Sequence, residues 1–300
     1  MDTSAINQDY YWMAKAIRLA QRGLYTTSPN PRVGCVIVSP DNHCVGEGAH
    51  LKAGTPHAEV HALKQAGELA KGATAYVTLE PCSHFGRTPP CAEALIHAQV
   101  KRVVIAMTDP NPNVSGNGIR KLQNAGIEVT SDVMSAEAGA LNPGFVKRML
   151  TGKPYVRVKQ GISLDGKIAL KNGVSQWITG PEARQDVHKY RAQSCAVLTG
   201  SGTLEADNPS LLVRPSEAKL SAYPLDTLRQ PVRVVVDGQS RLASHYQCFN
   251  DGFPTYVAST LHHADTKQGH YLKVNAKNNK VDLNHLMLQL GAMQFNEVWA

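Results

Sequence analysis

The chain has 300 residues, of which 42% are hydrophobic and 18% are charged. Its length favours two compact domains, and its composition excludes a disordered or fibrous protein. The N-terminal segment lacks the basic start and apolar run of a secretory signal, and no apolar stretch reaches membrane-spanning length. We therefore predict a cytoplasmic protein without a membrane segment.

The formal net charge of +7 at pH 7 is distributed unevenly along the chain. Residues 1–150 contain 14 Lys and Arg against 12 Asp and Glu, whereas residues 151–300 contain 17 against 12. The excess forms no basic block or helical stripe that could follow a phosphate backbone. Phosphorylated small molecules explain this balance at least as well as nucleic acid does, and a solvated basic surface is a further alternative, so no nucleic-acid partner is expected.

The first half of the chain alternates helical and extended patterns. Residues 9–23 place apolar side chains at helical spacing and stop at Gly23, which predicts a helix closed by a left-handed glycine. Short β-branched apolar runs predict buried strands with helices between them, the strands at 32–40, 73–79 and 101–107 and the helices at 58–70 and 91–99. This alternation predicts an α/β layered domain, in which Cys35 is a small buried hydrophobe.

A segment rich in Pro and Gly at 140–154 interrupts this pattern before a new strand begins at Tyr155. We place a domain boundary there, which divides the chain into residues 1–152 and 153–300. Further strands of a second α/β domain are predicted at 155–160, 195–203, 231–238, 255–259 and 296–300. Because the chain stops within the last apolar strand, we expect the second domain to lack its C-terminal part.

Three potential metal ligands stand next to predicted helices in the first domain. His57 opens one helix, and Cys82 and Cys91 flank the loop before the next one. One imidazole and two thiolates form a catalytic zinc set, which leaves the fourth tetrahedral position for water. Glu59, two positions after the histidine, is the carboxylate that would carry protons from that water to a ring nitrogen and to leaving ammonia. The sequence therefore predicts a Zn²⁺-dependent hydrolytic deaminase with Glu59 as its catalytic residue.

Other functions remain as alternatives to this interpretation. His57 and His61 have the i, i+4 spacing of a zinc protease, but that chemistry needs Glu directly after the first histidine, where this chain has alanine. A purely structural zinc would need a fourth closing ligand, which His84 could supply. A nucleic-acid or nucleoside deaminase with an appended basic binding domain is the third alternative. Such enzymes carry two residues between their cysteines, whereas this chain has eight between Cys82 and Cys91.

Three segments carry a resemblance to a known family, namely P-N-P-R-V-G-C-V-I-V at 29–38, G-E-G-A-H at 46–50 and T-L-E-P-C-S-H-F-G-R-T-P-P-C at 78–91. They closely resemble the deaminase half of the bifunctional riboflavin-biosynthesis deaminase/reductases. The resemblance covers residues 8–150, and the second half of the chain resembles the reductase half. It implies a cytidine-deaminase-like α/β/α layered domain followed by a dihydrofolate-reductase-like α/β domain.

The resemblance also implies an activity. It predicts hydrolytic deamination of 2,5-diamino-6-(5-phosphoribosylamino)pyrimidin-4-one, followed by NADPH-dependent reduction of the ribosyl group to a ribityl group. The phosphorylated pyrimidine and NADPH are then the expected small-molecule partners. By analogy with the family, a homo-oligomer is expected.

Individual site residues follow from the same resemblance. In the deaminase half, the positions that contact substrate are Asn30, His50 and His84. In the reductase half, the cofactor positions are Gly161, Trp177, Thr203 and Asp207, and the substrate positions are Lys159, Ser175, Arg191, Leu211 and Arg214. Small residues at 200–203 would let backbone N–H groups approach a phosphate, and an arginine can grip one with a planar fork of donors.

Overall fold

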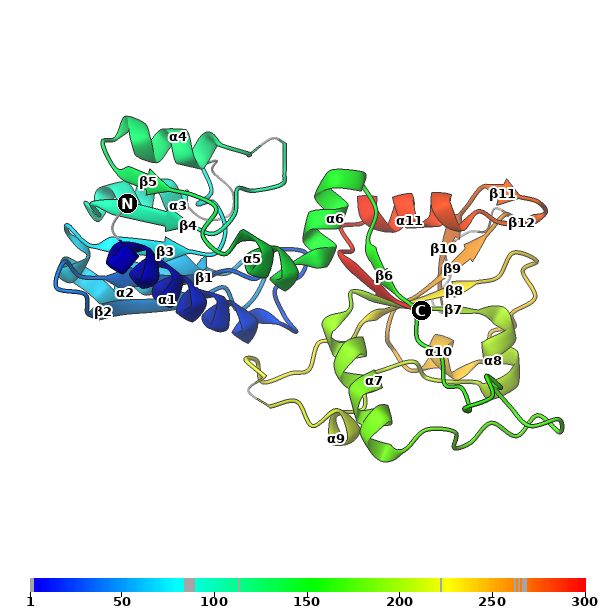
Figure 1. The fold of residues 1–300 in the computed structure, drawn as a ribbon. Helices are drawn as coiled ribbons and strands as arrows, with labels where there is room; N and C mark the ends of the chain where they lie inside the picture. Colours follow the sequence, from blue (N-terminus) through cyan, green and yellow to red (C-terminus); the bar gives the residue numbers. More distant parts are fainter. Residues whose placement is uncertain are drawn as a thin grey trace. The chain divides into compact units, whose positions relative to one another are not determined.

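A computed structural model describes residues 3–83, 90–112, 114–221, 223–261, 263, 265 and 269–300 of the chain. The chain divides into two compact units, Met1–Thr151 and Gly152–Ala300, each built on its own sheet (Figure 1). None of the described helices combines the length and apolar character needed to cross a membrane.

Among the described residues, the first unit contains a five-stranded sheet with the strand order β2-β1-β3-β4-β5. The strands are β1 (Gly34–Val38), β2 (Cys44–Ala49), β3 (Thr74–Val77), β4 (Arg102–Ile105) and β5 (Glu128–Thr130). β1 is antiparallel to both β2 and β3, while β3, β4 and β5 run parallel. The carboxyl ends of β3 and β4 therefore meet at one edge of the sheet, where the loops that follow them lie close together.

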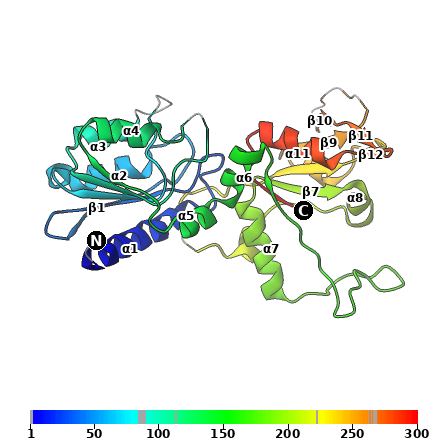
Figure 2. The same ribbon diagram turned by 45° about the horizontal axis from the view of Figure 1, so that its top comes forward.

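Helices cover both faces of this sheet (Figure 2). They are α1 (Thr3–Ala20), η1 (Gln21–Gly23), α2 (Ala58–Ala66), η2 (Gly67–Ala70), α3 (Cys91–His97), α4 (Asn117–Asn124), α5 (Ser135–Leu141) and α6 (Pro143–Thr151). Apolar residues of α2, α3 and α4 pack on one face, and those of α1 and α5 pack on the other. This arrangement is the α/β/α layering that the sequence predicts.

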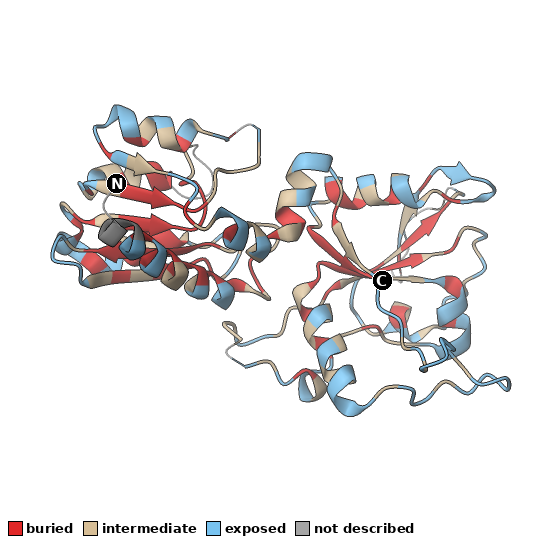
Figure 3. Cartoon of the chain, in the orientation of Figure 1, coloured by how far each residue is buried: buried red, intermediate tan, exposed pale blue. Residues whose placement is uncertain are grey.

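Strand β1 shows why a continuous apolar run forms a strand here. Cys35 and Ile37 belong to the core on the α2 side of the sheet, while Val36 and Val38 belong to the core on the α1 side. Side chains alternate across a strand, so a strand that is covered on both faces needs apolar residues at every position. All residues of β1 are buried (Figure 3), which confirms the prediction for Cys35.

Gly23 does not adopt the left-handed conformation that we predicted for it. It ends η1, and the chain continues through Leu24 in right-handed helical conformation, with φ −51° and ψ −36°. A Cβ at Gly23 would lie 2.5 Å from the carbonyl oxygen of His50. Glycine is required for a close approach between η1 and the residue that follows β2, and not for a positive φ.

The sheet that the structure describes in the second unit has six parallel strands in the order β10-β9-β8-β7-β13-β6. They are β6 (Tyr155–Arg157), β7 (Ala196–Gly200), β8 (Val232–Val236), β9 (Thr255–Ser259), β10 (His270–Lys273) and β13 (Glu297–Trp299), with a separate β11 (Ala276–Lys277) and β12 (Lys280–Val281) pair. The helices are α7 (Pro181–Gln193), α8 (Ser201–Asp207), α9 (Pro215–Ala218), α10 (Gln247–Asn250) and α11 (Leu283–Ala292). The α/β class predicted for this half is confirmed.

The predicted strand at 195–203 is wrong in its last three residues, because β7 ends at Gly200 and Ser201 begins α8. Gly200 is extended at the helix start, with φ −93° and ψ 160°. The side chain of Leu204 is fully buried and anchors this short helix. The β-branched run that supports the strand stops before Gly200, so the small residues after it form the start of α8.

The predicted strand at 155–160 also ends early, at Arg157. Residues 158–180 form no helix or strand. Within this segment Val158 is 73% exposed, Leu164 is 109% exposed and Trp177 is 65% exposed. Apolar side chains as exposed as these contribute little of the burial that would hold an extended segment in a sheet.

Candidate functional site

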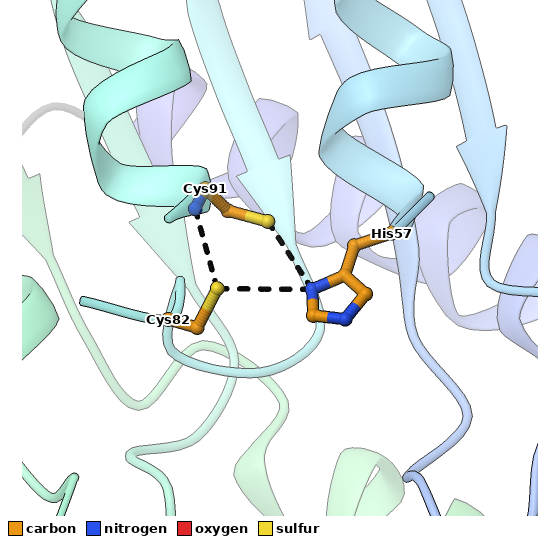
Figure 4. A group of neighbouring side chains, drawn as sticks. All are labelled: His57, Cys82 and Cys91. Atoms are coloured by element: carbon orange, nitrogen blue, oxygen red, sulfur yellow. Dashed lines mark hydrogen bonds between the residues drawn. The ribbon is translucent and has the colours of Figure 1, made fainter. Parts of the chain in front are cut away.

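The three predicted metal ligands converge at one edge of the first sheet (Figure 4). His57 is the residue before α2, Cys82 lies in the loop after β3, and Cys91 is the first residue of α3. The Nδ1 atom of His57 is 3.7 Å from Sγ of Cys82 and 3.3 Å from Sγ of Cys91. All three ligand atoms lie within 4.8 Å of one another.

These separations fit a tetrahedral zinc site. Zinc binds sulfur at about 2.3 Å and imidazole nitrogen at about 2.0 Å, so its tetrahedral ligands lie roughly 3.5 to 3.8 Å apart. Among the described residues, no fourth His, Cys, Asp or Glu side chain joins the group. The described residues therefore supply three of the four ligands of a tetrahedral zinc site.

The start of α3 favours a thiolate at this site. The backbone N–H of Cys91 donates to Sγ of Cys82 at 3.2 Å. Hydrogen bonds from Cys91 and His57 lower the pKa of Cys82, although burial opposes them. The same interaction with Cys82 raises the pKa of His57. Because a thiolate is the form that binds metal, the lowered pKa of Cys82 favours binding of a cation at this residue.

Glu59 is a buried carboxylate in the first turn of α2, two residues after His57. Its side chain is 3% exposed, and its Oε2 atom has no hydrogen-bond partner within the described residues. Burial and the nearby Cys82 thiolate raise the pKa of Glu59 to about 7. An unpaired oxygen in a buried position is costly unless a ligand uses it. This position and pKa suit a group that accepts and returns a proton near neutral pH.

Asn30 and His50 form a hydrogen-bonded pair beside the metal ligands. His50 is 1% exposed, and its ring lies edge-on to His57 with 5.1 Å between the ring centroids. The Nδ1 atom of His50 is 3.2 Å from the carbonyl oxygen of Pro56, and its Nε2 atom is 3.2 Å from Nδ2 of Asn30. Burial lowers the pKa of His50 to about 4, so the ring is neutral. The site therefore includes two of the three predicted substrate positions.

The third predicted position, His84, lies outside the described residues. Its predicted contact with substrate stays a prediction. The same holds for the alternative in which His84 closes a structural zinc site.

Sequence reasoning missed Glu80, which holds the loop after β4 against the segment that carries Cys82. The Glu80 side chain is 3% exposed. Its Oε2 atom accepts the backbone N–H groups of Asp109 at 3.2 Å and Gly116 at 2.9 Å, and its Oε1 atom accepts that of Gly118 at 2.8 Å. An acidic residue directly after an apolar strand, two positions before a metal ligand, was the available signal. The carboxylate caps the start of α4 from outside the helix.

In the second unit the structure brings Arg191 and Arg214 together. Arg191 lies on α7, and Arg214 directly precedes α9. Burial and the neighbouring Arg214 lower the pKa of Arg191 to about 10. The Nη1 atom of Arg191 donates to the carbonyl oxygen of Leu212 at 3.4 Å, and its Nε atom has no partner in the described chain. Two guanidinium groups in one place suit an anionic ligand.

The other predicted reductase residues are dispersed. Lys159, Gly161, Ser175 and Trp177 lie in the segment 158–180, and Thr203 and Asp207 are exposed on α8. Within the described residues, we find no hydrogen bond or ring contact that joins either group to the arginine pair. The side chain of Leu211 is 6% exposed and packs in the core, so its predicted contact with substrate would need the backbone.

A His-Cys-Cys centre with an unligated carboxylate beside it, on a cytidine-deaminase-like sheet, defines the class of zinc-dependent hydrolytic deaminases. The cytidine and deoxycytidylate deaminase zinc-binding region matches residues 6–107, and the RibD C-terminal domain matches residues 154–300. The riboflavin biosynthesis protein RibD of Escherichia coli strain K12 is 53% identical over 299 residues, which cover 97% of this chain and 81% of that protein. RibD of Haemophilus influenzae is 48% identical over 297 residues, which cover 98% of this chain and 79% of that protein.

Solved structures agree with these matches. RibD of Acinetobacter baumannii is similar with a TM-score of 0.88 and 49% identity over 98% of this chain and 80% of that one. The diaminohydroxyphosphoribosylaminopyrimidine deaminase/5-amino-6-(5-phosphoribosylamino)uracil reductase of Thermotoga maritima has a TM-score of 0.85 and 35% identity over 98% and 81%. The chain belongs to the RibD family of bifunctional riboflavin-biosynthesis deaminase/reductases. The resemblance inferred from sequence is confirmed, and the matches favour this family over a nucleic-acid deaminase.

Proposed function

We propose that residues 1–152 deaminate 2,5-diamino-6-(5-phosphoribosylamino)pyrimidin-4-one with zinc held by His57, Cys82 and Cys91. The observation that carries this assignment is the buried Oε2 atom of Glu59, which has no partner within the described residues and belongs to the helix that follows His57. Zinc supplies Lewis acidity, which makes water a nucleophile at neutral pH. The reaction replaces the C–NH₂ group with C=O and releases ammonia.

Glu59 moves the protons in this proposal. Its carboxylate accepts a proton from the attacking water and delivers it to the ring nitrogen next to the reacting carbon. It then takes the second proton of that water to the leaving amino group, which departs as ammonia. A carboxyl with a pKa of about 7 can accept and donate with similar ease near neutral pH.

Asn30 orients the pyrimidinone ring. The carbonyl of Pro56 can only accept a hydrogen bond, so Nδ1 of His50 carries the ring proton and Nε2 accepts from Asn30. The amide of Asn30 then keeps Oδ1 and its second N–H for the substrate. An acceptor and a donor side by side complement the N–H and C=O edge of a pyrimidinone.

We propose that residues 153–300 carry the reductase, which converts the ribosyl group to a ribityl group. NADPH bound to this unit supplies the hydride. Arg191 and Arg214 bind the substrate phosphate, and their proximity supports this assignment. The roles of Gly161, Trp177, Thr203 and Asp207 toward NADPH, those of Lys159, Ser175 and Leu211 toward substrate, and the homo-oligomer stay predictions.

Ammonia release from the pyrimidine phosphate tests the deaminase. Replacing Glu59→Gln should leave zinc stoichiometry unchanged while turnover falls by at least roughly 10²-fold. The matched control is Glu68→Gln, an exposed carboxylate in η2, which should retain full activity. Near-normal turnover in the Glu59 variant would refute its role. Oxidation of NADPH in the presence of the deaminated product tests the second unit.

A further inference from the structure

Glu217 places a carboxylate beside the arginine pair of the second unit, and the proposed function gives this carboxylate no role. Oε1 of Glu217 lies 2.7 Å from Nη1 of Arg214, three residues earlier in the chain. Both side chains are partly exposed, at 35% and 55%. Exposed ion pairs of this kind add little to the free energy of unfolding, so stability does not account for the contact between Glu217 and Arg214.

A second contact fixes this carboxylate in place. Oε2 of Glu217 lies 3.4 Å from Nε2 of His188, a side chain that is 2% exposed. Nδ1 of His188 accepts the backbone N–H of Arg214 at 3.2 Å. A ring that accepts at Nδ1 is neutral, and burial and the two arginines favour this form by lowering the pKa of His188. A neutral ring that accepts at Nδ1 carries its proton at Nε2, which therefore faces Glu217.

The guanidinium of Arg191 has donors that the group formed with His188, Arg214 and Glu217 does not satisfy. The Nε atom of its guanidinium has no partner in the described chain, and its Nη1 atom has one long hydrogen bond to Leu212. Two arginines and one glutamate leave one positive charge beside a neutral histidine. A ligand with several negatively charged oxygens can satisfy both the unpaired donor and the excess charge.

We propose that Glu217 is an internal counterion that occupies the phosphate position on Arg214 and competes with the phosphate group of the substrate. This inference rests on the proposed function of Arg191 and Arg214. When phosphate arrives, Oε1 of Glu217 leaves Arg214, and His188 retains the other carboxylate oxygen. The carboxylate keeps the two guanidinium groups from repelling each other in the free enzyme and weakens phosphate binding, which favours release of product.

The test measures binding of ribose 5-phosphate to the full chain by calorimetry at fixed, low ionic strength. Glu217→Gln should bind ribose 5-phosphate roughly 3- to 10-fold more tightly than the original chain, because a competing charge has been removed. In Glu217→Gln, sulfate should gain more than nitrate in its ability to compete with ribose 5-phosphate, because the Coulomb energy scales with the charge of the ligand. A purely structural role for Glu217 would give weaker binding and no dependence on ligand charge.

Glu182→Gln is the matched control, since it removes the same charge from an exposed position in the first turn of α7. Equal tightening in the two variants would mean a long-range charge effect and would overturn the inference. If Glu217→Gln does not fold, Glu217→Asp provides a carboxylate too short to reach both His188 and Arg214, and it should show intermediate tightening. Unchanged or weaker binding in Glu217→Asp would overturn the inference as well.

Two further variants separate this inference from the proposed function. Arg191→Ala and Arg214→Ala should each reduce affinity for ribose 5-phosphate by at least roughly 10-fold. If both arginine variants bind normally, the proposed phosphate site is wrong. If they lose binding while Glu217→Gln behaves like the original chain, the phosphate site stands and the counterion role of Glu217 is wrong.

Discussion

The Nδ2 atom of Asn30 and the Nε2 atom of His50 lie 3.2 Å apart, although twenty positions separate the two residues in the chain. His50 is held from its other side by the carbonyl oxygen of Pro56. The acceptor character of that carbonyl sets the tautomer of the imidazole, and the tautomer sets which end of the Asn30 amide faces it. One backbone oxygen therefore determines which end of the Asn30 amide faces away from His50.

Replacing Asn30→Asp should lower deaminase kcat/KM by roughly 10- to 100-fold, because an ionised carboxylate cannot donate to the unprotonated Nε2 atom of His50. The KM and kcat of ammonia release separate loss of orientation from loss of chemistry, and zinc content should stay at one per chain. The control is Asn42→Asp, a change in the turn between β1 and β2. Wild-type kinetics in the Asn30 variant would contradict its contact with substrate.

Removal of zinc should destabilise the first unit. A metal held at a free concentration 100 times its dissociation constant adds about 2.7 kcal/mol to folding stability, and a chelator withdraws that contribution. Thermal unfolding with and without chelator measures the loss. Cys82→Ser should abolish both zinc binding and the effect of the chelator, whereas Cys44→Ser should retain them. Full zinc stoichiometry in the Cys82 variant would show that the metal binds elsewhere.

Gly118→Ala should lower the free energy of unfolding by about 2 to 3 kcal/mol. A Cβ at this position would lie 2.0 Å from the carbonyl oxygen of Pro81 and 3.2 Å from Oε1 of Glu80, so the start of α4 would be pushed away from the Cys82 segment. Zinc affinity should fall with stability. Gly139→Ala is the control, because a Cβ there meets nothing within 4 Å in the middle of α5, and it should stabilise by about 0.5 to 1 kcal/mol. Equal unfolding free energies in these two variants would contradict the close approach.

Stability should depend on pH through His188. Burial and the neighbouring Arg191 and Arg214 lower its pKa below the ordinary value of 6.5, while Glu217 opposes them. As pH falls, the unfolded chain therefore takes up a proton at this histidine before the folded chain does. The contribution of neutral His188 to the free energy of unfolding is complete above pH 6.5. It is lost as pH falls from 6.5 toward the pKa of His188 in the folded chain.

Chemical denaturation from about pH 8 to about pH 5 checks this pH dependence. The stability difference between the original chain and His188→Gln should shrink as the solution becomes more acidic, because glutamine does not titrate. The exposed His43 provides the control through His43→Gln. A stability difference that stays constant across this range would show that the pKa of His188 is not lowered in the folded chain.

The metal site could be predicted from sequence because its information is local. His57 and Glu59 are two positions apart at the start of one helix, and Cys82 and Cys91 flank one loop. Residue types that bind zinc are few, and their chemistry hardly depends on what surrounds them. The apolar run of β1 was equally informative, because burial on both faces of a sheet leaves no position for a polar side chain.

Other features depend on which segments meet in space. Gly23 matches the pattern of a helix-ending glycine, yet what it requires is the nearby carbonyl of His50, 27 positions later in the chain. Glu80 binds backbone N–H groups 29 to 39 positions away, and a backbone donor leaves no trace in residue type. No local pattern could have predicted either contact.

The sequence by itself determined the two α/β halves and predicted the zinc ligands and the carboxylate beside them, since periodicity and ligand chemistry are carried by residue types at short range. Only the tertiary structure decided that His188 and Glu217 close on Arg214, and that Asn30 depends on His50. Hydrogen bonds and ion pairs require atoms within a few ångströms, and packing alone brings distant residues that close. The orientation of the side chains within each site is therefore a property of the folded chain.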